Sequence, residues 1–177
     1  MSKIPSEETR DLVAAEATAK YVRLHSSIGW WSLVLFVTLG IALEALHGFK
    51  VSWYVNVGDE TRRLLWRLAH AHGTFLGLIH IAFTVVVKER GGEKPVWRLI
   101  ASRCFIGASV AVPAGFLLGG AKTYGGDPGL GIALLPPGAA MLWIALVLTA
   151  LGWPCDPAAN TVKSGGKKKR TTDPRKK

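Results

Sequence analysis

The sequence predicts an all-α integral membrane protein, a bundle of four transmembrane helices with both termini in the cytoplasm. The first observation is that apolar residues make up 49% of the 177 residues although the formal net charge is +10. These two properties must lie in different parts of the chain. Residues 163–177 hold eight Lys and Arg and one Asp, which gives this tail +7 and leaves 10 − 7 = +3 for everything before it. Such a nearly neutral, apolar body is not that of a soluble nucleic-acid-binding domain.

The second observation is four apolar stretches, at residues 26–46, 64–87, 99–121 and 132–153. A helix of about 20 apolar residues, rising 1.5 Å per residue, crosses about 30 Å of hydrocarbon. The segments between the stretches hold most of the Asp, Lys, Asn and Gly, which is typical of loops. Each stretch is therefore predicted to be one transmembrane helix.

The third observation is the distribution of Lys and Arg, which are enriched on the cytoplasmic side of bacterial membrane proteins. Sixteen fall on one predicted side: Lys3, Arg10, Lys20 and Arg23, then Lys88, Arg90, Lys94 and Arg98, then eight in the tail. Four fall on the other, namely Lys50, Arg62, Arg63 and Lys122. We therefore expect a multi-pass protein of the inner (plasma) membrane with both termini inside.

Three regions follow from these spans. Residues 1–23 form a cytoplasmic segment in which Ser6 is the predicted N-cap of a short surface helix. Its acids exclude a cleavable signal peptide, which needs a cationic start. Residues 24–154 are the transmembrane domain, and residues 155–177 are a disordered basic tail expected to touch anionic lipid headgroups. The tail holds no aromatic residue, which argues against nucleic-acid binding.

Ionisable residues within the spans mark candidate sites, because each costs at least about 2.5 kcal/mol near the bilayer centre unless it is paired. On a straight helix of 100° per residue, Glu44 and His47 share a face of the first span, and Arg67 and His70 share a face of the second. Glu44 and Arg67 are also at similar depths. We predict an intramembrane polar cluster of these residues, with a buried ion pair between Glu44 and Arg67.

A second candidate site lies toward the inner side, where His80 and Arg103 fall at similar depths. Two groups that can both be cationic do not attract, so His80 is expected to be neutral there. In the third span, small residues such as Gly115 and Gly119 allow close helix packing. Pro136 and Pro137 are expected to interrupt the fourth span, and Asp127 before Pro128 is expected to cap a helix.

Five histidines in so small a membrane protein allow three interpretations. They can hydrogen-bond across helices, they can hold haem b, or they can form a proton or substrate pathway. Since His70 and His72 point about 200° apart on a helix, only His47 with His70 offers a haem ligand pair. His25 is expected near an interface. The cysteines, Cys104 and Cys155, form no metal or disulfide motif.

The strings RLAHAHG at 67–73 and GGDPGLGI at 125–132 resemble a group of uncharacterised small bacterial inner-membrane proteins with four spans. The resemblance covers residues 25–153 and implies the fold without an activity. The string HAHG is also similar to the histidine-bearing helices of haem-containing membrane oxidases, but a chain with four spans lacks their further ligand helices. No oxidase function is carried over.

No nucleophile with its base, phosphate-binding glycine loop or two-metal carboxylate site is recognisable, so we expect no enzymatic activity. The sequence favours a non-catalytic accessory or assembly subunit of a larger membrane complex. Two alternatives remain open, a haem b redox protein that uses His47 and His70 and a small proton-linked carrier.

Overall fold

The computed structural model describes residues 6–56, 58, 60–89 and 95–151, and these are almost entirely helical. In chain order the elements are α1 (Glu7–Gly48), α2 (Ser52–Val55), α3 (Glu60–Glu89), α4 (Pro95–Ala121), the 3-10 helix η2 (Leu130–Leu134) and α5 (Leu135–Leu151). The described residues contain no strand. The all-α prediction is confirmed, whereas the predicted tail at 155–177 lies outside the described residues.

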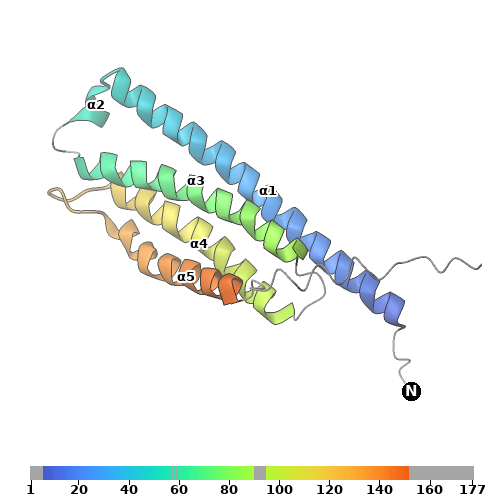
Figure 1. Cartoon of the computed structure of the whole chain (residues 1–177). Coiled ribbons are helices and arrows are strands. Elements are labelled where there is room, and N and C mark those ends of the chain that lie inside the picture. Colours follow the sequence, from blue (N-terminus) through green and yellow to red (C-terminus); the bar gives the residue numbers. More distant parts are fainter. Residues whose placement is uncertain (1–5, 57, 59, 90–94, 152–177) are drawn as a thin grey trace, which may run out of the picture.

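Four helices are long and apolar enough to cross a membrane, and they correspond to the four predicted spans. They run over Asp11–Gly48, Glu60–Glu89, Val96–Ala121 and Leu130–Leu151. They lie antiparallel in chain order, so that α1 packs on α3, α3 on α4 and α4 on α5 (Figure 1). Consequently α3 and α4 are the central helices, and α1 and α5 keep most of their apolar surface exposed.

α1 is a single helix of 42 residues that joins the predicted N-terminal segment to the first span without a break. Ser6 is its N-cap, as predicted, and its hydroxyl accepts a hydrogen bond from the Thr9 amide. At 1.5 Å per residue the helix is about 63 Å long, about twice the hydrocarbon thickness of a bilayer. The N-terminal end of α1 therefore extends past the end of its neighbours (Figure 1).

The three helices α1, α3 and α4 bury residues at alternating spacings of three and four. The buried positions that follow this spacing are His25, Gly29, Phe36 and Leu43 in α1, Ala69, Gly73, Leu76, His80, Phe83 and Val87 in α3, and Arg98, Ala101, Phe105, Ala108, Val112, Gly115 and Gly119 in α4, while Leu65, Gly77, Thr84 and Val86 in α3 and Ser102, Pro113 and Gly120 in α4 are buried beside them. This mean spacing of 3.5 residues is that of left-handed helix packing. A helical wheel plotted at 3.6 residues per turn therefore drifts by about 20° per heptad from this row of buried residues, which we call the seam.

Glycines bring α1 and α3 into backbone contact. A Cβ atom added to Gly29 would lie 2.9 Å from the carbonyl oxygen of Gly77, and the ring of Phe36 fills the space above Gly73. Small residues at a membrane helix crossing allow this approach and the close packing that stabilises it. The small residues predicted in α4 have the same role toward the next helix, since Gly115 faces Leu135 and the backbone of Gly131.

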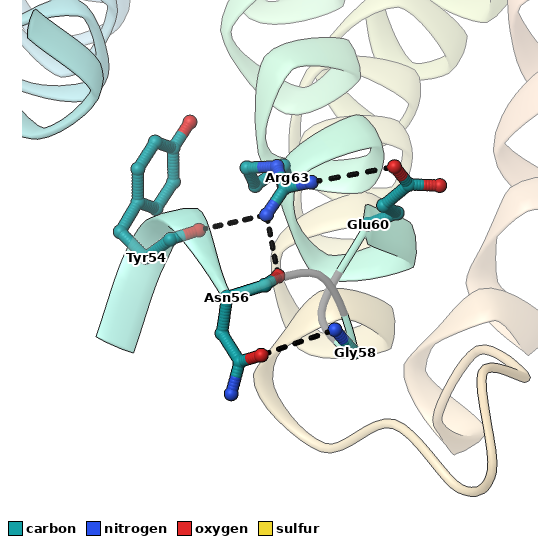
Figure 2. A network of polar contacts seen from close by, with 5 residues as sticks. All are labelled: Tyr54, Asn56, Gly58, Glu60 and Arg63. Atoms are coloured by element: carbon teal, nitrogen blue, oxygen red, sulfur yellow. Dashed lines mark hydrogen bonds and ion pairs between the residues drawn. The ribbon is translucent and has the colours of Figure 1, made fainter. Parts of the chain in front are cut away.

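At the end of the molecule that carries α2, one arginine fixes the connection between α1 and α3. The Arg63 guanidinium donates hydrogen bonds to the carbonyl oxygens of Tyr54 (3.3 Å) and Asn56 (2.6 Å) and lies 3.6 Å from the carboxylate of Glu60 (Figure 2). The side chain of Asn56 accepts a bond from the amide of Gly58. Carbonyls at the C-terminus of α2 thereby gain a charged donor.

The connection between α4 and α5 differs from the sequence prediction in two details. Asp127 does not cap a helix but pairs with Tyr124 in an isolated β-bridge, and the N-cap of η2 is Gly129. Pro136 and Pro137 do not interrupt a helix, because α5 begins at Leu135 and both prolines occupy its first turn. The amide that proline lacks has no helical partner at those positions, so the fold places the prolines where they cost least.

Replacing Gly29 by Ala is expected to lower the free energy of unfolding by about 1–3 kcal/mol, because its methyl group would press against the backbone of α3. The matched control is Gly48→Ala in the same helix, where no atom lies within 4 Å of an added Cβ. Thermal unfolding in mild detergent, followed by circular dichroism, measures both. Equal unfolding temperatures for the two variants would contradict the close crossing of α1 and α3.

Candidate functional site

A pair of buried histidines is the most distinctive polar feature of the described residues. His25 in α1 and His80 in α3 are both 0% exposed, and their Nδ1 atoms lie 2.6 Å apart. The Nε2 atom of His25 lies 2.8 Å from the hydroxyl of Ser102, and the Nε2 atom of His80 lies 2.7 Å from the hydroxyl of Ser109. Both serines belong to α4, so the site joins all three helices.

The hydrogen bonds fix the proton positions along this chain. The Ser109 hydroxyl donates to the carbonyl oxygen of Phe105 (2.8 Å), so it must accept from Nε2–H of His80. The Nδ1 atom of a neutral His80 is then an acceptor, and it receives Nδ1–H of His25. His25 in turn accepts at Nε2 from the Ser102 hydroxyl. With both histidines neutral, one set of tautomers thus gives a hydrogen-bond partner to all four ring nitrogens and to the hydroxyls of Ser102 and Ser109.

Aromatic rings enclose the two imidazoles. The ring of Phe83 packs edge-on against His25 with centroids 4.7 Å apart, and Phe105 lies 6.1 Å from His80 and 5.0 Å from Phe83. The imidazoles are stacked on each other with centroids 4.8 Å apart. Water is thereby kept from the pair, which is why its hydrogen bonds have to be made within the protein.

An arginine that was predicted on the cytoplasmic side of the spans is also buried in this half of the molecule. Arg98 in α4 is only 4% exposed, and its guanidinium donates to the hydroxyl of Thr18 in α1 (3.1 Å). Its guanidinium carbon lies 5.9 Å from the ring centroid of Tyr21, close enough for a cation–π contact. Arg98 therefore joins α1 to α4, two helical turns before His25 in α1.

The predicted outer cluster of Glu44, His47, Arg67 and His70 does not come together. Glu44, His47 and Arg67 are exposed on the surface of the chain, and within the described ranges no ion pair joins Glu44 to Arg67. His70 alone packs between helices, where its Nδ1 atom lies 2.6 Å from the carbonyl oxygen of Phe36.

The seam explains why the ion pair does not form. Starting from His25, alternating steps of four and three residues lead to Leu43, which is 5% exposed and takes the inward position at this end of α1. Glu44 is one residue further and points about 100° away from it. A helical wheel centred on Gly40 placed Glu44 inside, because Gly40 is only half-buried and lies at the edge of the buried face, whereas Leu43 lies within it.

The geometry of His70 does not suit the predicted haem ligation with His47. A Cβ atom on Gly40 would lie 2.5 Å from Nδ1 and 2.8 Å from Nε2 of His70, so this ring lies flush against the backbone of α1. Its Nδ1 atom is bonded to the carbonyl oxygen of Phe36, and His47 is exposed, so the two histidines are not arranged as a ligand pair. His72, on the opposite side of α3 as predicted, bonds to the carbonyl of Leu68 and packs against Phe116.

The predicted inner site of His80 and Arg103 is half present. His80 is buried as described, whereas Arg103 is exposed on the outside of α4 and makes no hydrogen bond or ion pair within the described part of the chain. The partner of His80 is His25, which was expected near an interface. Among the described residues, no group of three or more His, Cys, Asp or Glu could hold a metal ion.

A signal for the missing residues was present in the sequence. His25 stands four residues before Gly29 and eleven before Phe36, in the 3.5-residue series of the first span. Ser102 and Ser109 are one heptad apart in the third span, and serines are common hydrogen-bonding partners between membrane helices. Reading these spans as heptads would have placed His25 and His80 on facing surfaces, with Ser102 and Ser109 at the edge of the buried face of α4, one residue after Ala101 and Ala108.

Fold and site together define a class of protein: a chain of four apolar helices of membrane-spanning length, three of which meet at a buried and fully hydrogen-bonded histidine pair. No family model, curated protein or solved structure matches this chain. The resemblance to small bacterial inner-membrane proteins with four spans therefore stays a prediction. Function has to be argued from the geometry alone.

The hydrogen-bond chain predicts a different tautomer for each buried histidine, Nδ1–H for His25 and Nε2–H for His80. Nitrogen-15 NMR of histidine-labelled full-length protein distinguishes protonated from bare ring nitrogens, and His25→Ala and His80→Ala assign the signals. In Ser109→Ala the acceptor for His80 Nε2–H is lost, so the tautomer signals are expected to become mixed, whereas His47→Ala leaves them unchanged. The same tautomer at His25 and His80 would contradict the hydrogen-bond chain.

Proposed function

We propose that this protein is a multi-pass protein of a bacterial inner membrane, with both termini in the cytoplasm, and a non-catalytic accessory or assembly subunit of a larger membrane complex. The four apolar helices support the membrane placement. The distribution of Lys and Arg supports the orientation, and with it the histidine pair belongs to the inner half of the bundle.

The observation that carries the non-catalytic role is the saturation of the histidine pair. All four ring nitrogens are engaged by the chain's own side chains, and the hydrogen-bond chain ends on the carbonyl of Phe105. A general acid or base, or a metal ligand, needs a nitrogen that can reach a substrate or an ion. A saturated, enclosed pair instead fixes α1, α3 and α4 relative to one another.

An accessory role then falls to the outer faces of the bundle. α5 carries no charged residue and exposes large side chains such as Trp143, Ile144 and Leu146. Lipid can cover such a face, so the decisive question is whether another protein does. The histidine pair holds α1, α3 and α4 together, while α1 and α5 turn apolar faces outward. This arrangement suits a subunit that is held against neighbouring proteins by packing.

Photo-crosslinking in living cells tests this role. A benzoylphenylalanine is placed at Trp143 on α5, with Phe75 on α3 and Trp31 on α1 as matched positions, since all three side chains are more than half exposed. We expect a protein adduct of one reproducible mass from one of these faces and lipid adducts from the others. Lipid adducts alone at all three positions would contradict the accessory role.

A proton-linked carrier is the second candidate, and the buried hydrogen-bond chain favours it. A chain from Ser102 through His25 and His80 to Ser109 can in principle reverse its direction by moving one proton at each link. Reversal requires the Ser109 hydroxyl to leave the carbonyl of Phe105, which costs about 1 kcal/mol for the lost hydrogen bond. This cost, and the closed end of the chain, rank the carrier below the accessory subunit.

For the carrier, full-length protein in liposomes is expected to dissipate an imposed pH gradient faster than empty liposomes, as followed by an enclosed pH-sensitive dye. His80→Leu is expected to abolish this difference in rate, because it interrupts the hydrogen-bond chain. His72→Ala is expected to keep the difference, because the His72 side chain hydrogen-bonds only within its own helix. Identical rates with and without protein would exclude a proton pathway and leave the accessory role as proposed.

A further inference from the structure

A groove runs between α1 and α4 on the surface next to the histidine pair. It has a volume of about 410 Å³, and its wall includes apolar side chains of both helices, among them Leu24, Leu99 and Ile106. The hydroxyl-bearing Ser102, which donates to His25, also lines it. The groove is therefore bounded by the same two helices that the histidine pair and Arg98 hold together.

Two cations line this apolar groove, Lys20 from α1 and Arg103 from α4. Neither side chain has an ion pair or hydrogen bond within the ranges that the structure describes, and none of the groove's lining residues is acidic. Two unpaired cations above an apolar wall match a ligand with an anionic head and an apolar tail. A small polar anion would leave the apolar wall uncovered.

The orientation of α1 and α4 supports the same kind of ligand, one with an anionic head and an apolar tail. α1 and α4 run in the same direction; Lys20 stands nearer the N-terminal end than Leu24, and Arg103 stands between Leu99 and Ile106. Helical side chains tilt toward the N-terminus of their helix, so Lys20 and Arg103 both lean toward the inner membrane surface in the proposed orientation. An anionic headgroup held there would have its acyl chains along Leu24 and Ile106, toward the bilayer centre.

A neighbouring groove of about 620 Å³ on the other side of α1 offers a comparison. Its lining includes the cations Arg23 and Lys88 together with the acidic residue Asp11. The carboxylate offsets one of the two positive charges, so an anion is less favoured there than between Lys20 and Arg103. The two grooves are alike in position but differ in charge, which makes the second a matched control.

We propose that the groove between α1 and α4 binds the headgroup of an anionic phospholipid from the inner leaflet, with Lys20 and Arg103 on its phosphate. The inference rests on the membrane placement proposed above. Binding in this groove differs from a general attraction of lipids to the basic tail, because one lipid molecule would occupy one defined site. Bound there, the lipid would bridge α1 and α4 in addition to the contacts of Arg98 and Ser102.

Native mass spectrometry of the full-length protein in mild detergent, with equal phosphatidylglycerol and phosphatidylcholine added, tests the proposal. We expect one phosphatidylglycerol to be retained in preference. The double variant Lys20→Gln/Arg103→Gln should weaken that preference about thirtyfold, since each cation near the headgroup contributes roughly fivefold. The double variant Arg23→Gln/Lys88→Gln removes the same charge at the other groove and should keep the preference.

Three results would overturn the proposal. Equal retention in both double variants would assign the preference to the tail, which both retain, and an equal loss in both would mean that only total charge matters. Displacement of the bound lipid by inorganic phosphate would show that the site does not recognise the acyl chains. Failure of the protein to insert into vesicles of either lipid would refute the membrane placement itself, so the two proposals can fail separately.

Since all four substituted side chains are exposed, the variants are expected to fold, and circular dichroism of each confirms it. The single variant Arg103→Lys provides an independent check. It keeps the charge while removing the planar guanidinium, so a headgroup attracted mainly by charge should still be preferred. Loss of preference in Arg103→Lys, with Lys20→Gln unchanged, would contradict joint binding by both cations.

Discussion

The hydrogen bond between His25 and His80 is the interaction on which the arrangement of the helices depends. Two imidazoles enclosed by aromatic rings have no water to bond to, so each ring nitrogen must find a partner in the chain. The partners come from all three helices, because His25 belongs to α1, His80 to α3 and both serines to α4. The requirement to satisfy buried polar atoms thus fixes an arrangement that apolar packing leaves open, since lipid is as apolar as leucine.

Close helix packing and polar satisfaction act together along α1. Near the histidines, Gly29 meets the backbone of α3, and further along, Phe36 fills the space above Gly73 and its carbonyl bonds to His70. Most of these contacts follow the buried face of 3.5-residue spacing, while His70 lies one residue beside it. The seam carries polar pairs where a polar residue falls on it and close packing where a glycine does. It accommodates His25 and His80 at the same level as Ser102, and it excludes Glu44.

The four helices and the Ser6 cap could be predicted from the sequence, because apolar length and capping chemistry are local properties. Which face of each helix turns inward could not be read from the sequence, because it depends on how the side chains of neighbouring helices fit together. A wheel centred on Gly40, which lies at the edge of the buried face, placed Glu44 inside, and Arg103 was paired with a histidine that it does not contact. Arg98 was missed for another reason: charge counting treats every arginine near a span as loop, whereas Thr18 and the ring of Tyr21 allow this one to be buried.

The polar residues in this half of the molecule form two groups: the buried histidine pair, which contacts only the protein, and the cations of the surface groove, which can contact a ligand. His25 and His80 have every ring nitrogen occupied, so their contribution is to hold three helices at a fixed distance. Lys20 and Arg103 are unpaired within the described residues and lie on the wall that those helices create. Ser102 belongs to both, because it lines the groove while donating to His25. A ligand in the groove would therefore lie against the hydroxyl that donates to His25, so surface binding and the packing of the core can influence each other through Ser102.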